Sequence, residues 1–394
     1  MFVSDLKNKY IELYGKQDIK VFFAPGRINL IGEHTDYNGG YVFPCAITKG
    51  TYALAAKRED RNVRMYSENF SEDHVITFHL DDLSFKKEHG WANYPKGMIA
   101  KMLEAGFEMP HGIDILYYGI IPNGAGLSSS ASIELVTGVL LETLYDLSIE
   151  RMDMVRIGQK VENEFIGVNS GIMDQFAIGM GKHNHGMLLD CQNLLYEYAP
   201  LHLGQYSLLI MNTNKERTLA SSKYNERRKE CESALNDLQA YADIQSLGEL
   251  SPKEFEELKQ YITTPTELRR ATHAVYENQR TKTSLKKLKE GDLEAFGELM
   301  NQSHVSLRDD YEVTGKELDT LVEAAWKQDG VIGARMTGAG FGGCAIAIVE
   351  KEKAAAFQEK VEAYYQSVIG CKPSIYEASA GDGAKELTGE VVIQ

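Results

Sequence analysis

Hydrophobic and polar residues alternate with two different periods along this 394-residue chain. Between residues 20 and 80, short runs rich in aromatic and β-branched residues are separated by Gly, Asn and Asp turns: KVFF, YVFPCAI, TYALAA, VRMYS and VITFH. Runs of this kind predict the strands of an antiparallel or mixed sheet. GIDILYYGI, at 112–120, predicts one more strand.

Helical spacing begins after that strand. Apolar residues from Ala131 to about Leu147 recur at the spacing of one helix face, and 152–166 and 172–180 are also predicted as helices. GMLLD and SLLIMNT are predicted strands, and 223–330 has charged helical patterns. ARMTGAGFGGCAIAIVE predicts a strand, a glycine turn and a strand, followed by a last helix and the strand PSIYEA. The fold class is therefore α+β, with a domain boundary expected near 190–210.

Length and charge limit the classes of protein. A chain of 394 residues fits two domains, so a cleft between them is the expected place for chemistry. The net charge of -15 argues against nucleic acid and anionic membranes as partners. No apolar run approaches the ~18 residues of a membrane span, and the N-terminus has no export signal. The five cysteines form no metal-binding cluster, which favours reduced thiols and a cytoplasmic location.

A glycine and serine loop, GAGLSSSAS, lies between the strand at 112–120 and the following helix. Glycines allow a ligand to approach the backbone, and a helix that starts near Ser129 or Ser130 presents free N–H groups to an anion. The loop lacks the lysine of a Walker A motif and the third glycine of a dinucleotide fingerprint. The pattern predicts a phosphate-binding loop, and simple capping of the helix by serine is the alternative.

A second glycine loop contains Gly338, Gly340 and Gly343 in the spacing G-x-G-x-x-G. The alternating run CAIAIVE follows it, so a strand stands where a dinucleotide-binding fold has a helix. The sequence also lacks the other motifs of protein kinases in the right order. On its residues alone, this segment predicts a tight turn between two strands.

The segment PGRINLIGEHTDYN, at 25–38, is unusually polar for a stretch that directly follows a strand. Glu33, His34 and Asp36 offer the mixture of hydrogen-bond acceptors and donors that orients a polyol. A sugar site is therefore the favoured interpretation. A zinc site is disfavoured because the segment has no second histidine, and a solvated turn is the remaining alternative.

Together, the three segments resemble the three motifs of the GHMP kinase superfamily, and APGRINLIGEHTDYNGG resembles the signature of its galactokinase members. The resemblance runs from about residue 20 to the C-terminus and includes GVNSGIMDQF and SSKYNERRKEC. It implies a two-domain GHMP kinase fold with the active site in the interdomain cleft. The expected domains are 1–200, with the sugar motif and the phosphate loop, and 201–394, whose last strand could return to the first domain.

The implied activity is transfer of the γ-phosphate of ATP to the C1 hydroxyl of galactose, with Mg²⁺ as cofactor, by a monomer or weak homo-oligomer. Asp174 would take the proton of the attacking hydroxyl and Arg27 would stabilise the transition state. The implied sugar-binding residues are Glu33, His34, Thr35, Asp36, Gly171 and Tyr224. The implied nucleotide-binding residues are Ser67, Gly124, Ala125, Gly126, Leu127, Ser128, Ser129 and Ser130. Mg²⁺ would be held by Ser130 and Glu162, and the loop from Gly338 to Gly343 would shape the cleft.

Several alternatives remain open at this stage. Asp174 could cap a helix, and Glu162 could be a surface residue of the helix that also carries Lys160 and Glu164. The substrate could be a related sugar such as N-acetylgalactosamine or arabinose, because one substituent changes binding by only about 1 to 3 kcal/mol. A sensor that binds sugar and ATP without turnover is the rival from another class, but the uninterrupted serine loop disfavours it.

Overall fold

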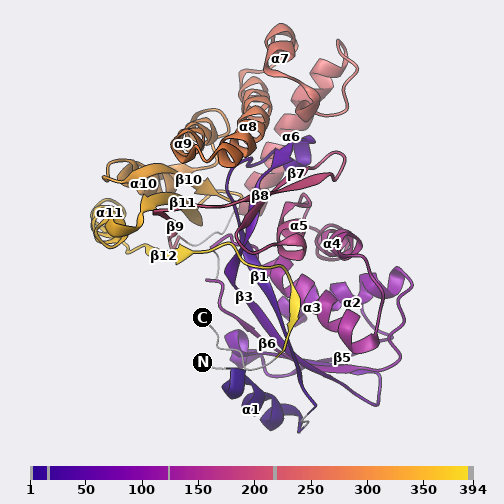
Figure 1. Ribbon diagram of the computed structural model, residues 1–394. Coiled ribbons are helices and arrows are strands. Elements are labelled where there is room, and N and C mark those ends of the chain that lie inside the picture. Colours follow the sequence, from indigo (N-terminus) through magenta and orange to yellow (C-terminus); the bar gives the residue numbers. More distant parts are fainter. Residues whose placement is uncertain (1–2, 16–17, 123–124, 216–219, 389–394) are drawn as a thin grey trace.

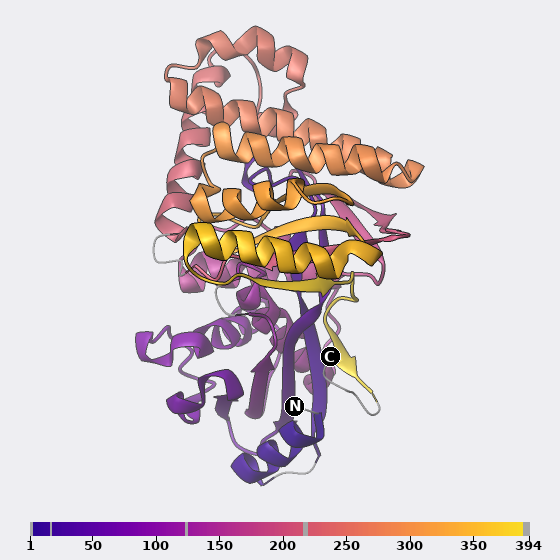
Figure 2. The same ribbon diagram turned by 90° about the vertical axis from the view of Figure 1, so that its left-hand side faces the viewer.

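The computed structural model describes residues 3–15, 18–122, 125–215 and 220–388. Two long antiparallel strands, β1 and β3, run through the middle of the molecule and connect its two halves (Figures 1 and 2). They belong to a six-stranded sheet of order β13-β1-β3-β6-β4-β5, in which only β4 and β6 are parallel. Its strands are, in that order, Lys385–Leu387, Lys20–Asn29, Pro44–Lys57, Ile113–Gly119, Asn62–Ser67 and Ile76–His79.

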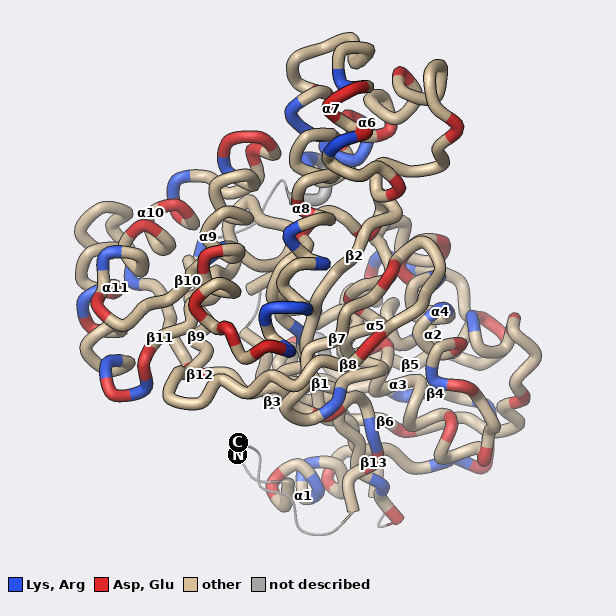
Figure 3. Tube along the Cα trace, turned by 45° about the horizontal axis from the view of Figure 1, so that its top comes forward, with Lys and Arg blue, Asp and Glu red and all other residues tan. Residues whose placement is uncertain are grey.

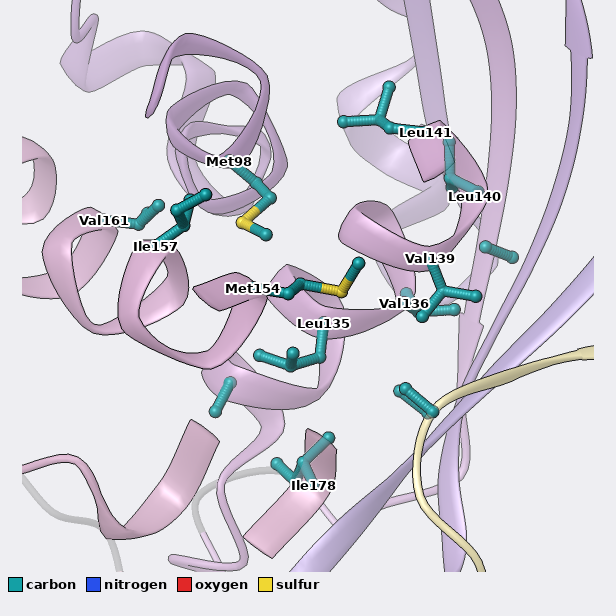
Figure 4. Close-up of a cluster of buried hydrophobic side chains, with 14 of the residues drawn as sticks. Met98, Leu135, Val136, Val139, Leu140, Leu141, Met154, Ile157, Val161 and Ile178 are labelled. Carbon is teal, nitrogen blue, oxygen red and sulfur yellow. The ribbon is translucent and has the colours of Figure 1, made fainter. Parts of the chain in front are cut away.

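Helices cover both faces of this sheet in the first half. Helix α1 lies on one face, and α2 to α5 form a layer on the other (Figure 1). Figure 4 shows Met98, Met154 and Ile157 from this layer packed toward α3. At Gly138 of α3 a Cβ atom would lie 2.7 Å from Cε of Met98, so a larger residue there would force the methionine side chains to move. The helices are Val3–Tyr14, Asn93–Glu104, Ser129–Tyr145, Arg151–Lys160 and Met173–Met180, with one π-helical turn at Val161–Ile166.

The second half packs helices against a four-stranded antiparallel sheet of order β10-β11-β9-β12. These strands are Val331–Thr337, Cys344–Glu350, Tyr206–Asn212 and Ser374–Ala378. The helices α6 to α11 are Ala220–Gln239, Pro252–Leu258, Pro265–Glu290, Leu293–Asp309, Gly315–Trp326 and Ala354–Ile369. Figure 3 shows acidic and basic residues interspersed over these helices. None of the described helices is long and apolar enough to cross a membrane.

The two halves are joined by a shared hydrophobic cluster and by a small sheet. The cluster contains Ile28 and Phe43 from the first half and Ile210 and Ile346 from the second. A three-stranded sheet of order β2-β7-β8 (Tyr41–Val42, His185–Asp190, Tyr196–Pro200) lies beside it. This continuous packing fixes the positions of the loops of the two halves relative to each other. A site built from both halves requires such fixed positions.

The α+β class is confirmed, and among the described strands the six-stranded sheet is the mixed one. The predicted elements next to the motifs are confirmed as well. The helix after the serine loop begins at Ser129, and the second glycine loop connects β10 and β11. The strand PSIYEA is β12, in the second sheet, whereas the later strand β13 pairs with β1 of the first sheet. Neither α1 nor β13 was predicted from the sequence. The division of the chain at residue 200 stays a prediction.

Candidate active site

Two cavities lie side by side between the motifs, and Ser130 lines both of them. The first, of about 300 Å³, is lined by Arg27, Glu33, His34, Asp36, Ser130, Glu162, Val168, Ser170, Gly171, Met173, Asp174, Tyr224, Asn225, Gly338 and Ala339. The second, of about 230 Å³, is lined by Thr51, Ser67, Asn69, Phe70, Trp91, Tyr94, Tyr117, Gly119, Ile121, Ser129, Ser130 and Ile133. We call them the polar cavity and the aromatic cavity.

A tight turn after β1 brings the acidic residues of 25–38 to the polar cavity. Gly32 has φ 92°, and a Cβ atom there would lie 2.6 Å from the carbonyl oxygen of Tyr41, so the turn requires glycine. His34 also has a left-handed backbone, with φ 61°. The hydroxyl of Thr35 donates to the carbonyl oxygens of Gly32 and Tyr41 at 2.9 and 2.7 Å. Thr35 lines neither cavity, and its side chain supports the turn.

Glu33 is 1% exposed, yet its carboxylate accepts several hydrogen bonds. The Nδ2 atom of Asn29 donates to it at 2.8 Å and the backbone N–H of Gly338 at 2.6 Å, while Arg335 lies 3.4 Å away. Burial raises the pKa of Glu33, and the positive charge of Arg335 opposes that rise. The second glycine loop thus contributes directly to this cavity, because Gly338 binds Glu33 and Ala339 lines the wall.

His34 and Asp36 differ in the way burial changes their charge. Burial lowers the pKa of His34 to about 3, so the ring is neutral, with Nδ1 2.7 Å from the hydroxyl of Tyr37 and Nε2 3.2 Å from the carbonyl oxygen of Ala339. Burial and the charge of Asp174 raise the pKa of Asp36 to about 7. The polar cavity therefore places a neutral ring beside carboxylates, and the carboxylates can accept hydrogen bonds from the hydroxyl groups of a sugar.

Gly171 and Tyr224 complete this wall. A Cβ atom at Gly171 would lie 1.8 Å from Oδ2 of Asp36, so no larger residue fits without displacing that carboxylate. The ring of Tyr224 lies 5.5 Å from the ring of His34 and 5.3 Å from that of Tyr37. Both residues line the polar cavity, and their contact with a sugar stays a prediction.

Asp174 and Arg27 form a bidentate ion pair, although 147 positions separate them in the chain. Nε and Nη2 of Arg27 donate to the two carboxylate oxygens at 2.7 and 2.9 Å, and Ser128 donates a further hydrogen bond to Asp174. The remaining Nη1 group of Arg27 donates to the carbonyl oxygen of Gly126 at 2.7 Å. Asp174 lies in the first turn of α5, but its carboxylate binds Arg27 rather than capping the helix. The pair links the sugar motif to the phosphate loop.

The predicted phosphate loop reaches both cavities through its last residues, because Ser129 lines the aromatic cavity and Ser130 lines both. Ser128 has a left-handed backbone with φ 61°, and α3 begins at Ser129, so the free N–H groups of the helix start at the junction. The side chains of Ala125 and Leu127 are buried in the cluster shared by the two halves. Only the backbone atoms of these two residues could therefore contact a ligand. Gly124, which was predicted to belong to this loop, lies outside the described residues.

Ser130 and Glu162 offer two hard oxygen ligands at the same junction. The hydroxyl of Ser130 donates to Oε1 of Glu162 at 2.8 Å, and Ser170 donates to the other oxygen. Glu162 is 6% exposed and lies in the π-helical turn, so the alternative of a surface residue is wrong. No group of three histidine, cysteine or acidic residues suited to a metal occurs within the described ranges. A hydroxyl and a carboxylate fit Mg²⁺, which takes its other ligands from water and phosphate.

The aromatic cavity contains functional candidates that the sequence analysis missed. Ser67 ends β4 in its wall, and its predicted contact with the nucleotide stays a prediction, whereas Phe70, Trp91 and Tyr94 were not identified from the sequence. The rings of Phe70 and Trp91 are nearly parallel, with centroids 6.4 Å apart and planes at 12°. These residues share no motif, so their sequence carried no signal for this cavity. In the polar cavity, Asn225 was also missed, although it directly follows Tyr224.

Family models match most of the chain. The galactokinase galactose-binding signature matches residues 8–57, the GHMP kinases N terminal domain 93–182 and the GHMP kinases C terminal domain 284–367. The mevalonate kinase of Methanococcus jannaschii has the same fold, with a TM-score of 0.66 at 19% identity over 94% of this chain and all of that one. The class of protein that this fold and these cavities define is therefore that of the GHMP kinases.

More similar relatives narrow the class. Galactokinase of Exiguobacterium sibiricum is 60% identical over 387 residues, which are 98% of this chain and 99% of the relative. Galactokinase of Clostridium beijerinckii is 56% identical over 385 residues, again 98% and 99% of the two chains. The crystal structure of Lactococcus lactis galactokinase complexed with galactose has a TM-score of 0.96 at 54% identity and covers 98% of this chain and all of that one. The chain belongs to the galactokinase family.

Proposed function

We propose that this protein transfers the γ-phosphate of ATP to the C1 hydroxyl of D-galactose, giving galactose 1-phosphate and ADP. The observation that carries the proposal is the position of the Asp174–Arg27 pair. It lines the polar cavity and is hydrogen-bonded to the phosphate loop, so a sugar hydroxyl and a terminal phosphate would meet beside it. Catalysis of phosphoryl transfer consists largely of such positioning together with electrostatic stabilisation.

In the proposed complex, galactose occupies the polar cavity. The carboxylates of Glu33 and Asp36 accept hydrogen bonds from sugar hydroxyls, and the neutral ring of His34 lies beside them. Gly171 leaves the space that Asp36 fills, and Tyr224 closes the wall. Buried acceptors of this kind select a sugar strongly, because each loses its hydrogen bond when a hydroxyl is absent or wrongly oriented.

Asp174 orients the attacking hydroxyl and accepts its proton in the proposed reaction. Both carboxylate oxygens are held by Arg27, and Ser128 fixes one of them, so the carboxylate cannot rotate freely. Arg27 is 5% exposed, and its guanidinium would face the negative charge of the transferring phosphoryl group. Its contact with the carbonyl oxygen of Gly126 keeps it next to the phosphate loop.

The nucleotide extends from the junction into the aromatic cavity. The phosphates approach the start of α3 at Ser129 and Ser130, and the base lies among Phe70, Trp91 and Tyr94. Ser130 and Glu162 would hold Mg²⁺. The ion, when bound, neutralises phosphate charge.

The proposal includes a cytoplasmic location, where MgATP is available, and a monomer or weak homo-oligomer.

The test is release of ADP by the purified protein with MgATP and D-galactose, against a control without sugar and matched samples of glucose and N-acetylgalactosamine. We expect turnover that depends on galactose and is at least ~100-fold lower with glucose, since a misplaced hydroxyl leaves buried groups unpaired. Higher turnover with N-acetylgalactosamine than with galactose would show that galactose is not the preferred substrate. Binding of galactose and ATP without ADP release would support the sensor function instead.

A further inference from the structure

The turn that carries Glu33 depends on a side chain from the other half of the molecule. After β1 ends at Asn29, the backbone leaves the sheet, and its buried N–H groups need new acceptors. The carboxylate oxygen Oε1 of Glu277, in α8, accepts from the N–H of Gly32 at 3.0 Å and lies 3.4 Å from the N–H of Glu33. A single buried carboxylate thus holds two consecutive peptide groups of the sugar turn.

Glu277 is itself rigidly held. It is 0% exposed, Ser303 donates to the same Oε1 atom at 2.6 Å, and Nε of Arg280 donates to Oε2 at 2.7 Å. Burial alone would raise the pKa of Glu277, but the charge of Arg280, together with His273, Arg335 and the hydrogen bond from Ser303, outweighs it and lowers that pKa to about 2. The group is therefore an ionised acceptor, and such hydrogen bonds are stronger than neutral ones.

His273 holds the opposite side of the same residue. Its Nε2 atom lies 3.1 Å from the carbonyl oxygen of Glu33, and its Nδ1 atom lies 3.0 Å from the hydroxyl of Ser306. His273 and Glu277 are four residues apart in α8, so they project from one face of the helix. That face binds Glu33 through its N–H and its carbonyl oxygen, while the carboxylate of Glu33 points toward the polar cavity.

We propose that Glu277 is a positioning residue of the sugar site, which fixes the orientation of Glu33 and thereby the affinity for galactose without touching the sugar. The inference rests on the proposed function of the polar cavity. Glu277 does not line that cavity. Its role is transmitted through the backbone of Gly32 and Glu33, and it makes α8 part of the sugar site although 244 positions separate Glu277 from Glu33.

The test is Glu277→Gln, which keeps the size of the side chain but removes its charge. We expect the KM for galactose, and its dissociation constant in the absence of ATP, to rise about tenfold, which is the scale of one charge-assisted hydrogen bond. The KM for ATP should stay within ~2-fold, because the aromatic cavity and the phosphate loop do not depend on Glu277. If Glu277 had a purely structural role, the variant would have a lower melting temperature, and its KM for galactose would not rise more than its KM for ATP.

Asp114→Asn is the matched control. Asp114 is also 0% exposed and also binds two arginines, Arg58 at 2.8 Å and Arg64 at 2.6 Å, but it lies in β6, outside both cavities. This variant should be less stable with both KM values unchanged. The inference is overturned if folded Glu277→Gln keeps the wild-type galactose affinity, or if its two KM values rise together.

If Glu277→Gln does not fold, Ser303→Ala tests the inference through the same comparison of the galactose constants with the KM for ATP. It removes one donor to Oε1 of Glu277, so the galactose constants alone should rise, by about 2-fold. An unchanged affinity in that variant also overturns the inference. The proposed function is judged separately, by galactose-dependent ADP release of the wild-type protein, and the direct binding measurement still tests Glu277 if that turnover is absent.

Discussion

The polar cavity and the aromatic cavity share Ser130 but are built by opposite rules. Most residues of the polar cavity come from two short segments, 27–36 and 162–174, and its charged side chains, such as Glu33 and Asp174, are held by specific hydrogen bonds. The aromatic cavity is assembled from single residues such as Phe70, Trp91 and Tyr94, which lie on separate turns and helices. Directional recognition of hydroxyls requires a fixed cluster of polar groups, whereas stacking on a base can be supplied by any suitably placed ring.

Asp174 lines the polar cavity and is hydrogen-bonded to Ser128 of the serine loop, so its loss should have the largest effect. Asp174→Asn removes the proton acceptor but keeps the shape of the side chain. We expect kcat to fall by roughly 10²- to 10⁴-fold while the galactose affinity changes little. Steady-state ADP release and direct galactose binding measure the two quantities. A variant with near wild-type kcat would exclude Asp174 from the chemistry.

Glu33→Ala tests the polar cavity alone. The carboxylate of Glu33 is buried and is proposed to accept hydrogen bonds from the sugar, so its removal should raise the galactose KM by about 10- to 100-fold. The KM for ATP should be unchanged. The melting temperature serves as the control, because Arg335 and the N–H of Gly338 lose a partner in this variant. An unchanged galactose KM in folded protein would remove Glu33 from the sugar site.

Trp91→Ala tests the aromatic cavity in the same way and should give the reverse pattern. Loss of an aromatic surface is worth roughly 0.5 to 1.5 kcal/mol beyond its buried area, so we expect the ATP KM to rise by about 2- to 10-fold and the galactose KM to stay constant. Measuring both constants in the Glu33 and Trp91 variants completes the comparison. If Trp91→Ala raised only the galactose KM, the assignment would be reversed, with the sugar in the aromatic cavity and the nucleotide in the polar cavity.

The same contrast explains how much the sequence could predict. The strands and helices around the motifs were predictable because their hydrophobic periods are clear, and the serine loop and the polar segment were predictable because their chemistry is local. The roles of Arg27 and Asp174 were expected from the family resemblance alone, and the structure brings the two side chains together across 147 positions of the chain. Thr35 shows the limit of a motif, because its position suggested a sugar contact and its side chain supports the turn instead.

Long-range packing accounts for what the sequence did not predict. Trp91 and Phe70 become a cavity wall only when the turn after β4 lies beside the start of α2. Glu277 has the appearance of an ordinary charged residue on a helix, and nothing in its neighbourhood indicates that it binds the backbone of Gly32. The short strand β13 pairs with β1 from the far end of the chain. Each of these depends on contacts between segments that have no common local pattern.

The smallest expected effect concerns the charge of Asp36, and it is measured as stability. Burial and Asp174 raise the pKa of this carboxyl from 3.8 to about 7 in the folded protein. Between those two values the folded state binds a proton that the unfolded state does not, so this contribution to stability is lost as the pH rises toward 7. Asp36→Asn carries no charge at any pH. Its melting temperature relative to the wild type should therefore be higher at pH 8 than at pH 5, by roughly 2–4 °C.

Melting curves of both proteins at pH 5 and pH 8, without ligand, check this expectation. Asp114→Asn is again the control, because the pKa of Asp114 is lowered rather than raised. Burial alone would raise that pKa, but hydrogen bonds from Arg64 and Arg58 outweigh the effect of burial. At pH 8, Asp36→Asn should bind galactose more weakly than the wild type does, even though its melting temperature relative to the wild type is higher there than at pH 5. Such a result would mean that the polar cavity retains a destabilising charge because the sugar requires it, a cost that functional sites commonly carry. An equal melting difference at the two pH values would show instead that Asp36 titrates in its ordinary range and that the polar cavity is as well solvated as a surface.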